Sequence, residues 1–202
     1  MITAVLLDLG NVVLGIDFKR VFNAWAEFSN TPVERFMERW TTDAAYQAHE
    51  RGEISFEEYA RHLGQVFEVE MTNQQWEAGW NSIWTTPFHN VIDMLPNVAE
   101  RYPLYGFTNT NEVHKIYWQS VYADAFRSFR HMFVSSDLGI RKPDIPAFQQ
   151  VCDAMNTPPG EVLFLDDTQE NVDGAKLAGL NAVLVESEDA VVQQLQQLLL
   201  TE

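Results

Sequence analysis

Basic residues and cysteine are scarce in this chain of 202 residues. Its 13 Lys and Arg stand against 29 Asp and Glu, which gives a formal net charge of -16 at pH 7. Binding to a nucleic-acid backbone depends on clustered Lys and Arg, and anionic membrane surfaces repel such an acidic chain. We therefore expect neither nucleic acid nor a membrane among its partners. The single cysteine, Cys152, excludes an internal disulfide and fits a reducing compartment.

Long apolar runs are absent as well. No segment approaches the ~20 consecutive apolar residues that cross a bilayer. The apolar stretch at the amino terminus contains Asp8 and has no basic leader, unlike a secretion signal. We therefore expect a cytoplasmic protein. Because 46% of its residues are hydrophobic, the chain can form a globular core. Its oligomeric state stays open, with a monomer slightly favoured.

The first stretch has the pattern of a buried strand that ends in a carboxylate. Five of the six residues from 2 to 7 are apolar with no alternating polar face, and Asp8 and Gly10 follow. Such a run is typical of the centre of a parallel sheet, and Gly10 permits a sharp turn. Ligands bind at the carboxyl ends of strands in open α/β sheets. We expect Asp8 at a functional site, although a strand-terminal Asp can also serve only as a cap or turn residue.

From residue 103 onward, short apolar strands alternate with helices. The predicted strands cover residues 104–107, 132–134, 162–165 and 181–185. This alternation indicates right-handed crossovers and a parallel sheet between two helical layers. The predicted fold class is therefore α/β, with a three-layer Rossmann-like core made of residues 1–14 and 102–202.

Between the first strand and the second, the chain has helical patterns and no convincing strand. Asp17, Ser55 and Thr72 are the expected N-caps, and Ser55 and Thr72 each begin a capping box. Residues 15–101 are thus predicted to form an inserted helical cap. We interpret its aromatic residues as the packing core between helices rather than as a ligand site.

Polar groups follow the predicted strands where ligands bind in such a fold. They are Asp8, Thr108 with Asn109, Lys142, and the pair Asp166 and Asp167. Converging carboxylates repel one another unless a cation lies among them, and oxygen ligands of this kind suit Mg²⁺. Lys142 can hold a phosphate, and Thr108 offers a hydroxyl to an anion.

Each of these residues also has an ordinary structural explanation. One of the two acids can cap the helix that begins near residue 168, Lys142 can be a solvated surface residue, and Thr108 can belong to a simple turn. It is the chain order of acid, hydroxyl, lysine and paired acids that is specific.

This order resembles the haloacid dehalogenase superfamily. Asp8 to Val12 matches the first motif of that superfamily, Thr108 the second, Lys142 in Arg-Lys-Pro the third, and the Asp166–Asp167 pair the fourth. Within the superfamily a closer similarity, which runs nearly from end to end, is to bacterial sugar-phosphate phosphatases of the alpha-D-glucose-1-phosphate phosphatase type. The segments that carry this similarity include 49–55, 108–111 and 138–143.

The resemblance implies a Mg²⁺-dependent phosphomonoester hydrolase that acts on a small phosphorylated metabolite, a sugar phosphate like glucose 1-phosphate, through an aspartyl-phosphate. In that scheme Asp8 is the nucleophile. Thr108, Asn109 and Lys142 hold the phosphoryl oxygens, with Lys142 counted among the catalytic residues. The metal lies among Asp8, the Gly10 carbonyl, Asp166 and chiefly Asp167.

Gly10 departs from the superfamily, because most of its phosphatases carry a general acid there, two residues after the nucleophile. Losing such a group costs on the order of 10²–10⁴ in rate. A sugar 1-phosphate has an acidic leaving oxygen that needs less protonation; alternatively Asp17, His49 or Glu50 of the cap supplies the proton.

Two other functions stay open at this point. One is a metal-independent 2-haloacid dehalogenase, in which Asp8 attacks carbon. The other is a non-catalytic domain that binds a phosphorylated ligand or a partner. Metal dependence discriminates the first from a phosphatase, and turnover discriminates the second.

Overall fold

The computed structural model describes residues 1–200 and contains a five-stranded parallel sheet. Its strands are β1 (Ala4–Leu7), β4 (Leu104–Thr108), β5 (His131–Val134), β6 (Val162–Asp166) and β7 (Asn181–Leu184). They are ordered β5-β4-β1-β6-β7, so the first strand of the chain lies in the centre. Each neighbouring pair is parallel, and Leu7 is in register with Gly106 on one side and Leu165 on the other. The predicted fold class is confirmed.

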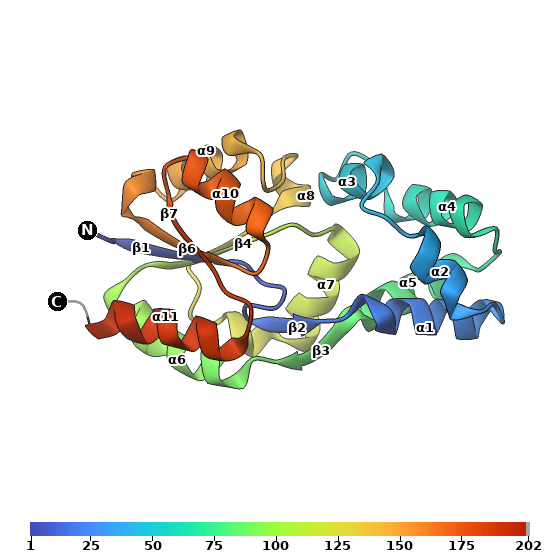
Figure 1. The fold of residues 1–202 in the computed structure, drawn as a ribbon, viewed down its shortest axis with the longest axis horizontal. Coiled ribbons are helices and arrows are strands. Elements are labelled where there is room, and N and C mark those ends of the chain that lie inside the picture. Colours follow the sequence, from blue (N-terminus) through green and yellow to red (C-terminus); the bar gives the residue numbers. More distant parts are fainter. Residues whose placement is uncertain (201–202) are drawn as a thin grey trace.

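Side chains of β1 alternate between two hydrophobic cores because successive residues of a strand point to opposite faces. Val5 and Leu7 belong to the core that includes α6 (His89–Arg101), α7 (Glu112–Val121) and α11 (Glu188–Leu200). Ala4 and Leu6 belong to the core under α9 (Ile145–Ala154) and α10 (Gln169–Leu177). Figure 1 shows these two helical layers above and below the sheet. This double burial explains why the β1 sequence has no polar face.

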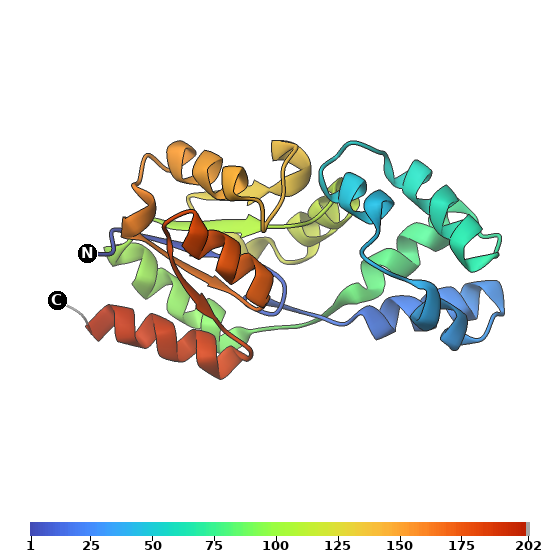
Figure 2. The ribbon, with the colours of Figure 1, turned by 45° about the horizontal axis from the view of Figure 1, so that its top comes forward.

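A group of helices extends beyond one end of the sheet, as both ribbon views show (Figures 1 and 2). These cap helices are α1 (Phe18–Ser29), α2 (Val33–Arg39), α3 (Ala44–Glu50), α4 (Phe56–Phe67) and α5 (Asn73–Trp80). The remaining short helices are η1 (Asn81–Ile83), η2 (Ala123–Phe126), α8 (Ser135–Leu138) and η3 (Pro159–Glu161). None of the helices within residues 1–200 has the length and apolar character needed to cross a membrane.

The cap helices begin where their capping residues predict. The Asp17 carboxylate accepts from the Lys19 backbone N–H, and the capping boxes at Ser55 and Thr72 are both complete. The aromatic residues of the insertion pack together as expected. Trp25 and Trp80 are buried and stack with their ring centroids 5.7 Å apart.

A strand inside the insertion was not predicted. β3 (Trp84–Pro87) pairs antiparallel with β2 (Leu14–Ile16), and this two-stranded ribbon joins the cap helices to the rest of the chain (Figure 1). Its partner is about 70 residues away in sequence, so the pairing leaves no local signal beyond the β-branched Thr85 and Thr86.

Helix α6 follows the ribbon and contacts α11 beside the sheet (Figure 1). The division of the chain at residues 14 and 101 stays a prediction. Because α6 packs beside the sheet, its position favours a boundary at β3, where the chain returns to the α/β core before residue 101.

Gly174 allows α10 to approach the loop that carries Lys142. A Cβ at this position would overlap the backbone carbonyl oxygen of Pro143. The helix and the loop therefore touch backbone to backbone. This contact fixes the position of Pro143, the residue that follows Lys142.

Gly174→Ala should lower the free energy of unfolding by about 1–3 kcal/mol, because the added methyl group forces the helix and the loop apart. Urea unfolding measures this effect. Gly160→Ala is the matched control, because its nearest neighbour would be a backbone oxygen 4.0 Å away, and it should change stability little. Equal stabilities of the two variants would contradict the close packing.

Candidate active site

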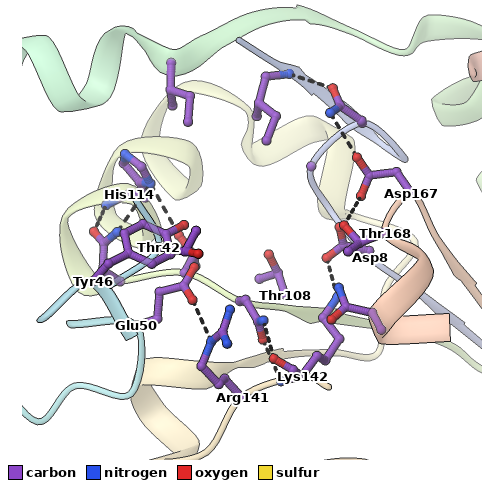
Figure 3. Close-up of a pocket in the computed structure, with 18 of the residues that line it drawn as sticks. Asp8, Thr42, Tyr46, Glu50, Thr108, His114, Arg141, Lys142, Asp167 and Thr168 are labelled. Atoms are coloured by element: carbon purple, nitrogen blue, oxygen red, sulfur yellow. Dashed lines mark hydrogen bonds and ion pairs between the residues drawn. The ribbon is translucent and has the colours of Figure 1, made fainter. Parts of the chain in front are cut away.

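A cavity of about 540 Å³ lies at the carboxyl edge of the sheet, between the sheet and the cap. The sheet contributes residues that follow β1, β4 and β6, and the cap contributes residues of α3 and α5. Figure 3 shows Asp8, Asp167 and Lys142 on one side of this cavity and Tyr46, Glu50 and His114 on the other. The structure thus brings together the strand-end residues that the sequence singles out.

Lys142 is the charged centre of the site. Its ammonium group donates to Asp8 Oδ1 at 2.7 Å and to Asp166 Oδ2 at 2.6 Å, and the residue is 0% exposed. The rings of Phe107 and Phe164 lie 5.3 Å from the same nitrogen. A solvated surface lysine is therefore excluded. Burial alone would lower the pKa of Lys142, but Asp166 and Asp8 raise it above its usual value, so the side chain stays charged.

Asp166 has its carboxylate oxygens engaged by the protein. Besides Lys142, it accepts from the Thr168 backbone N–H at 2.8 Å and from the Asn171 side chain at 3.0 and 3.2 Å. Asp166 therefore accepts from the backbone at the start of α10, the capping role expected for one of the two acids. It also orients Lys142. With no exposed surface, Asp166 suits a supporting role better than direct contact with a ligand.

Asp167 is less buried than Asp166 and faces the cavity (Figure 3). Asn11 Nδ2 donates to it at 3.0 Å and the Thr168 hydroxyl at 3.2 Å, which holds the carboxylate toward Asp8. Within residues 1–200, ligand atoms of Asp8, Asp166 and Asp167 lie within 4.8 Å of one another. This spacing and these oxygen donors fit a divalent cation of the Mg²⁺ type.

The turn after Asp8 is made by Asn11 rather than by Gly10. Asn11 has a φ of 53°, a left-handed conformation that Asn tolerates, and its side chain accepts from the Ile16 backbone N–H. Gly10 has another role, because a Cβ there would lie 3.0 Å from Ile16 Cδ1. Ile16 therefore takes up the space into which a side chain at position 10 would extend.

Thr108 and Asn109 differ in what their side chains do. Thr108 is the last residue of β4 and lines the cavity between Lys142 and the cap (Figure 3). The Asn109 carboxamide instead bonds the Lys142 backbone, donating to its carbonyl at 2.8 Å and accepting from its N–H at 2.9 Å. The Asn109 side chain thus positions Lys142, and it does so from the neighbouring strand end.

The three cap residues considered as proton donors lie in different places. Asp17 lines the cavity while it caps α1, and Glu50 lines the cavity at the end of α3. His49 is buried, its ring stacks on Tyr59 4.9 Å away, and it is not part of the cavity wall. Glu50 forms a 2.7 Å ion pair with Arg141 on the side of the cavity away from Asp8 (Figure 3).

Several residues of the site carry little signal in the sequence. Tyr46, His114 and Asn171 lie inside helices, where each looks like an ordinary surface or core residue. Arg141 is the exception, because it is adjacent to Lys142 in the third motif. His114 is buried and its Nε2 lies 3.1 Å from the Trp80 carbonyl oxygen, so it joins α7 to the end of α5.

The fold and the site together define an α/β protein with an acid–lysine–acid centre under a helical cap. Consistent with this, a family model described as haloacid dehalogenase-like hydrolase matches residues 2–179. The chain belongs to the haloacid dehalogenase-like hydrolase family.

The individual proteins that the chain resembles share less than a third of its residues. D-ribitol-5-phosphate phosphatase of Bacteroides thetaiotaomicron is 22% identical, with 89% of each chain covered. Drimenol cyclase drtB of Aspergillus calidoustus is 28% identical over 96% of this chain, which spans only 36% of that protein. A crystal structure of a family enzyme from Bacteroides thetaiotaomicron, in complex with magnesium and inorganic phosphate, has a TM-score of 0.79 at 23% identity. The match covers 91% of this chain and 94% of the chain in that crystal structure, and this likeness shows the shared fold.

Burial raises the pKa of Asp8 from 3.8 to about 7; Lys142 opposes this change, and Asp166 and Asp167 add to it. Burial also raises the pKa of Asp167. The centre thus holds more negative charge than Lys142 alone balances, which is the condition that a bound cation relieves.

Without a divalent cation, Asp8 should make the protein less stable as the pH rises from about 4 to about 7. Its carboxyl has a pKa near 3.8 in the unfolded chain and about 7 in the folded protein. In this window the folded state keeps a proton that the unfolded state has released, so a higher pH favours unfolding.

Urea unfolding in EDTA at about pH 5 and about pH 8 measures this contribution. Wild type should lose more unfolding free energy between the two conditions than Asp8→Asn, which cannot ionise. Asp124→Asn removes an exposed carboxylate and should behave like wild type. If wild type and Asp8→Asn lose the same amount, the pKa of Asp8 is not raised.

Proposed function

We propose that this protein is a Mg²⁺-dependent phosphomonoester hydrolase that acts on a small sugar phosphate through an aspartyl-phosphate on Asp8. The observation that carries the proposal is the buried ammonium of Lys142 between Asp8 and Asp166, with Asp167 facing the same cavity. Family membership and the phosphatases among the relatives support it. The substrate is a small phosphorylated metabolite, in keeping with the size of the cavity.

Asp8 is the nucleophile. Its Oδ1 accepts from Lys142, which leaves Oδ2 to form the bond to phosphorus. As this bond forms, the bond between phosphorus and the leaving oxygen breaks, and that oxygen departs with the electron pair. Water then attacks phosphorus, the bond between phosphorus and Asp8 Oδ2 breaks with its electron pair left on the carboxylate, and inorganic phosphate carrying the oxygen and protons of that water is released. Lys142 and Thr108 stabilise the charge on the phosphoryl oxygens during both steps.

Asp8, Asp167 and the Gly10 carbonyl are the proposed direct metal ligands. Mg²⁺ bound there supplies positive charge to the phosphoryl oxygens. Asp166 assists through water or through its hold on Lys142, because its oxygens already accept from Thr168, Asn171 and Lys142.

A sugar 1-phosphate is the substrate that best suits Gly10. Because Gly10 has no side chain, no acid extends from this position toward the leaving oxygen. The anomeric oxygen of a sugar 1-phosphate is a better leaving group than an ordinary alkoxide and needs less help from a general acid. The cap excludes bulk water during the reaction.

A 2-haloacid dehalogenase reaction is less well supported. It requires no cation, whereas three carboxylates with ligand atoms within 4.8 Å are costly to bury without one. A cytoplasmic location stays a prediction from the composition of the chain.

Purified protein should release inorganic phosphate from glucose 1-phosphate in the presence of Mg²⁺ and should lose this activity in EDTA. Glucose 6-phosphate should be hydrolysed more slowly, because its leaving oxygen is less acidic. Asp8→Asn should lower kcat by at least about 10³-fold, since the amide cannot form the covalent intermediate. Phosphate release assays measure all three effects.

Asp124→Asn, which is exposed and remote from the cavity, should keep wild-type activity. Folded protein that binds Mg²⁺ but hydrolyses no phosphomonoester would contradict the proposed function. Halide release from haloacids in EDTA would support the dehalogenase reaction instead.

A further inference from the structure

The cavity has a second polar end, on the side away from Asp8. Figure 3 shows Glu50 and Arg141 directed at each other there, across the cavity from Asp8 and Asp167. Arg141 Nε donates to Glu50 Oε2 at 2.7 Å, and the phenol of Tyr46 lies beside the same carboxylate. The proposed phosphoryl transfer uses none of these groups at the second end.

The Glu50 carboxylate is held in a fixed position by both parts of the protein. It lies at the end of α3 and is 3% exposed, and its own backbone carbonyl accepts from the Ser135 hydroxyl at 2.6 Å. Ser135 in turn follows β5 of the sheet. The cap therefore carries Glu50 into the cavity, and the core fixes it there through Ser135 and Arg141.

The positively charged side chains of this cavity already form ion pairs with carboxylates. Among the described residues of its wall, the basic side chains are Lys142, Arg141 and His114. Lys142 is paired with Asp8 and Asp166, and Arg141 is paired with Glu50. Burial lowers the pKa of His114 to about 3, so its ring is uncharged at neutral pH. A second anionic group on a substrate would meet no unpaired cation here.

The rest of this end is suited to hydroxyl groups and to the carbon faces of a sugar. A carboxylate accepts from hydroxyls, and hydroxyl and amide side chains can both donate and accept. Aromatic rings offer apolar surface to C–H groups. Hydroxyl and amide groups in the cavity wall are those of Thr42, Gln47 and Asn111, and the wall is completed by Trp80 and Trp84, which are largely buried in the aromatic packing.

We propose that Glu50, fixed by its ion pair with Arg141, is a specificity-determining residue that accepts an uncharged, hydroxyl-bearing leaving group and rejects one with a second anionic group. This inference rests on the proposed phosphatase function and adds to it the chemistry of the group that leaves.

The test compares glucose 1-phosphate with glucuronic acid 1-phosphate. The second compound differs only in carrying a carboxylate in place of the hydroxymethyl group, and each has a single phosphate to release. Wild type should prefer glucose 1-phosphate by about tenfold or more in kcat/KM. Glu50→Gln removes the charge and frees Arg141, so the preference should fall by about tenfold, chiefly through KM for the acidic substrate.

Arg141→Gln provides an independent test, because it removes the cation of the pair, to which an acidic leaving group could bind, and keeps Glu50. It should move the preference in the opposite direction, further toward glucose 1-phosphate. Glu53→Gln is the matched control, since it makes the same change in a neighbouring, half-exposed ion pair with Arg51 and should keep the wild-type preference. Thermal unfolding checks that the variants are folded.

A folded Glu50→Gln protein with the wild-type preference would overturn the inference, as would a wild type that hydrolyses both sugars equally. Hydrolysis of other phosphomonoesters but of neither sugar phosphate would also overturn it and would leave the catalytic proposal intact. If wild type hydrolyses no phosphomonoester, both proposals fail.

Discussion

The charge balance around Lys142 is the constraint on which the site depends. Three carboxylates meet at the carboxyl edge of the sheet, and one buried ammonium group bonds to two of them. A buried charge is costly unless it is paired, so the position of Lys142 is as important as its presence. The structure fixes this position from several elements. Asn109 holds the Lys142 backbone, Gly174 allows α10 to pack against the next residue, and Asp166 is itself oriented by the start of α10.

The contacts that hold the cap in place differ from the charge pairs around Lys142. Its own stability comes from aromatic packing around Trp25 and Trp80, and the β2–β3 ribbon attaches it to the α/β core. The end of α3 reaches the core with polar groups, through the Glu50 backbone carbonyl and the ion pair with Arg141, and the end of α5 does so through the Trp80 carbonyl and His114. Because Arg141 directly precedes Lys142, the residue that fixes Glu50 and the residue proposed to hold the phosphate belong to one loop.

The sequence is sufficient to predict the α/β class, the strand ends and the residues that meet there. It succeeds because a strand buried on both faces has a distinctive composition, and because the chain order of acid, hydroxyl, lysine and paired acids is specific although each residue alone is not. It does not predict the β3 strand, whose partner is distant in the chain, or the place of α6 against α11. Nor does it show that Asn11 makes the first turn or that the Asn109 side chain serves Lys142. Those roles depend on backbone geometry and on contacts between strand ends, which no local pattern encodes.

The central claim is that Asp8 becomes covalently phosphorylated. The most direct test is a rapid acid quench of the protein during turnover of a radiolabelled phosphomonoester with Mg²⁺, followed by peptide mapping. The account predicts label on the peptide that contains Asp8, lost on treatment with mild base as expected for an acyl phosphate, and no label in EDTA. Label on another residue, or rapid hydrolysis with no labelled peptide at any quench time, would contradict it.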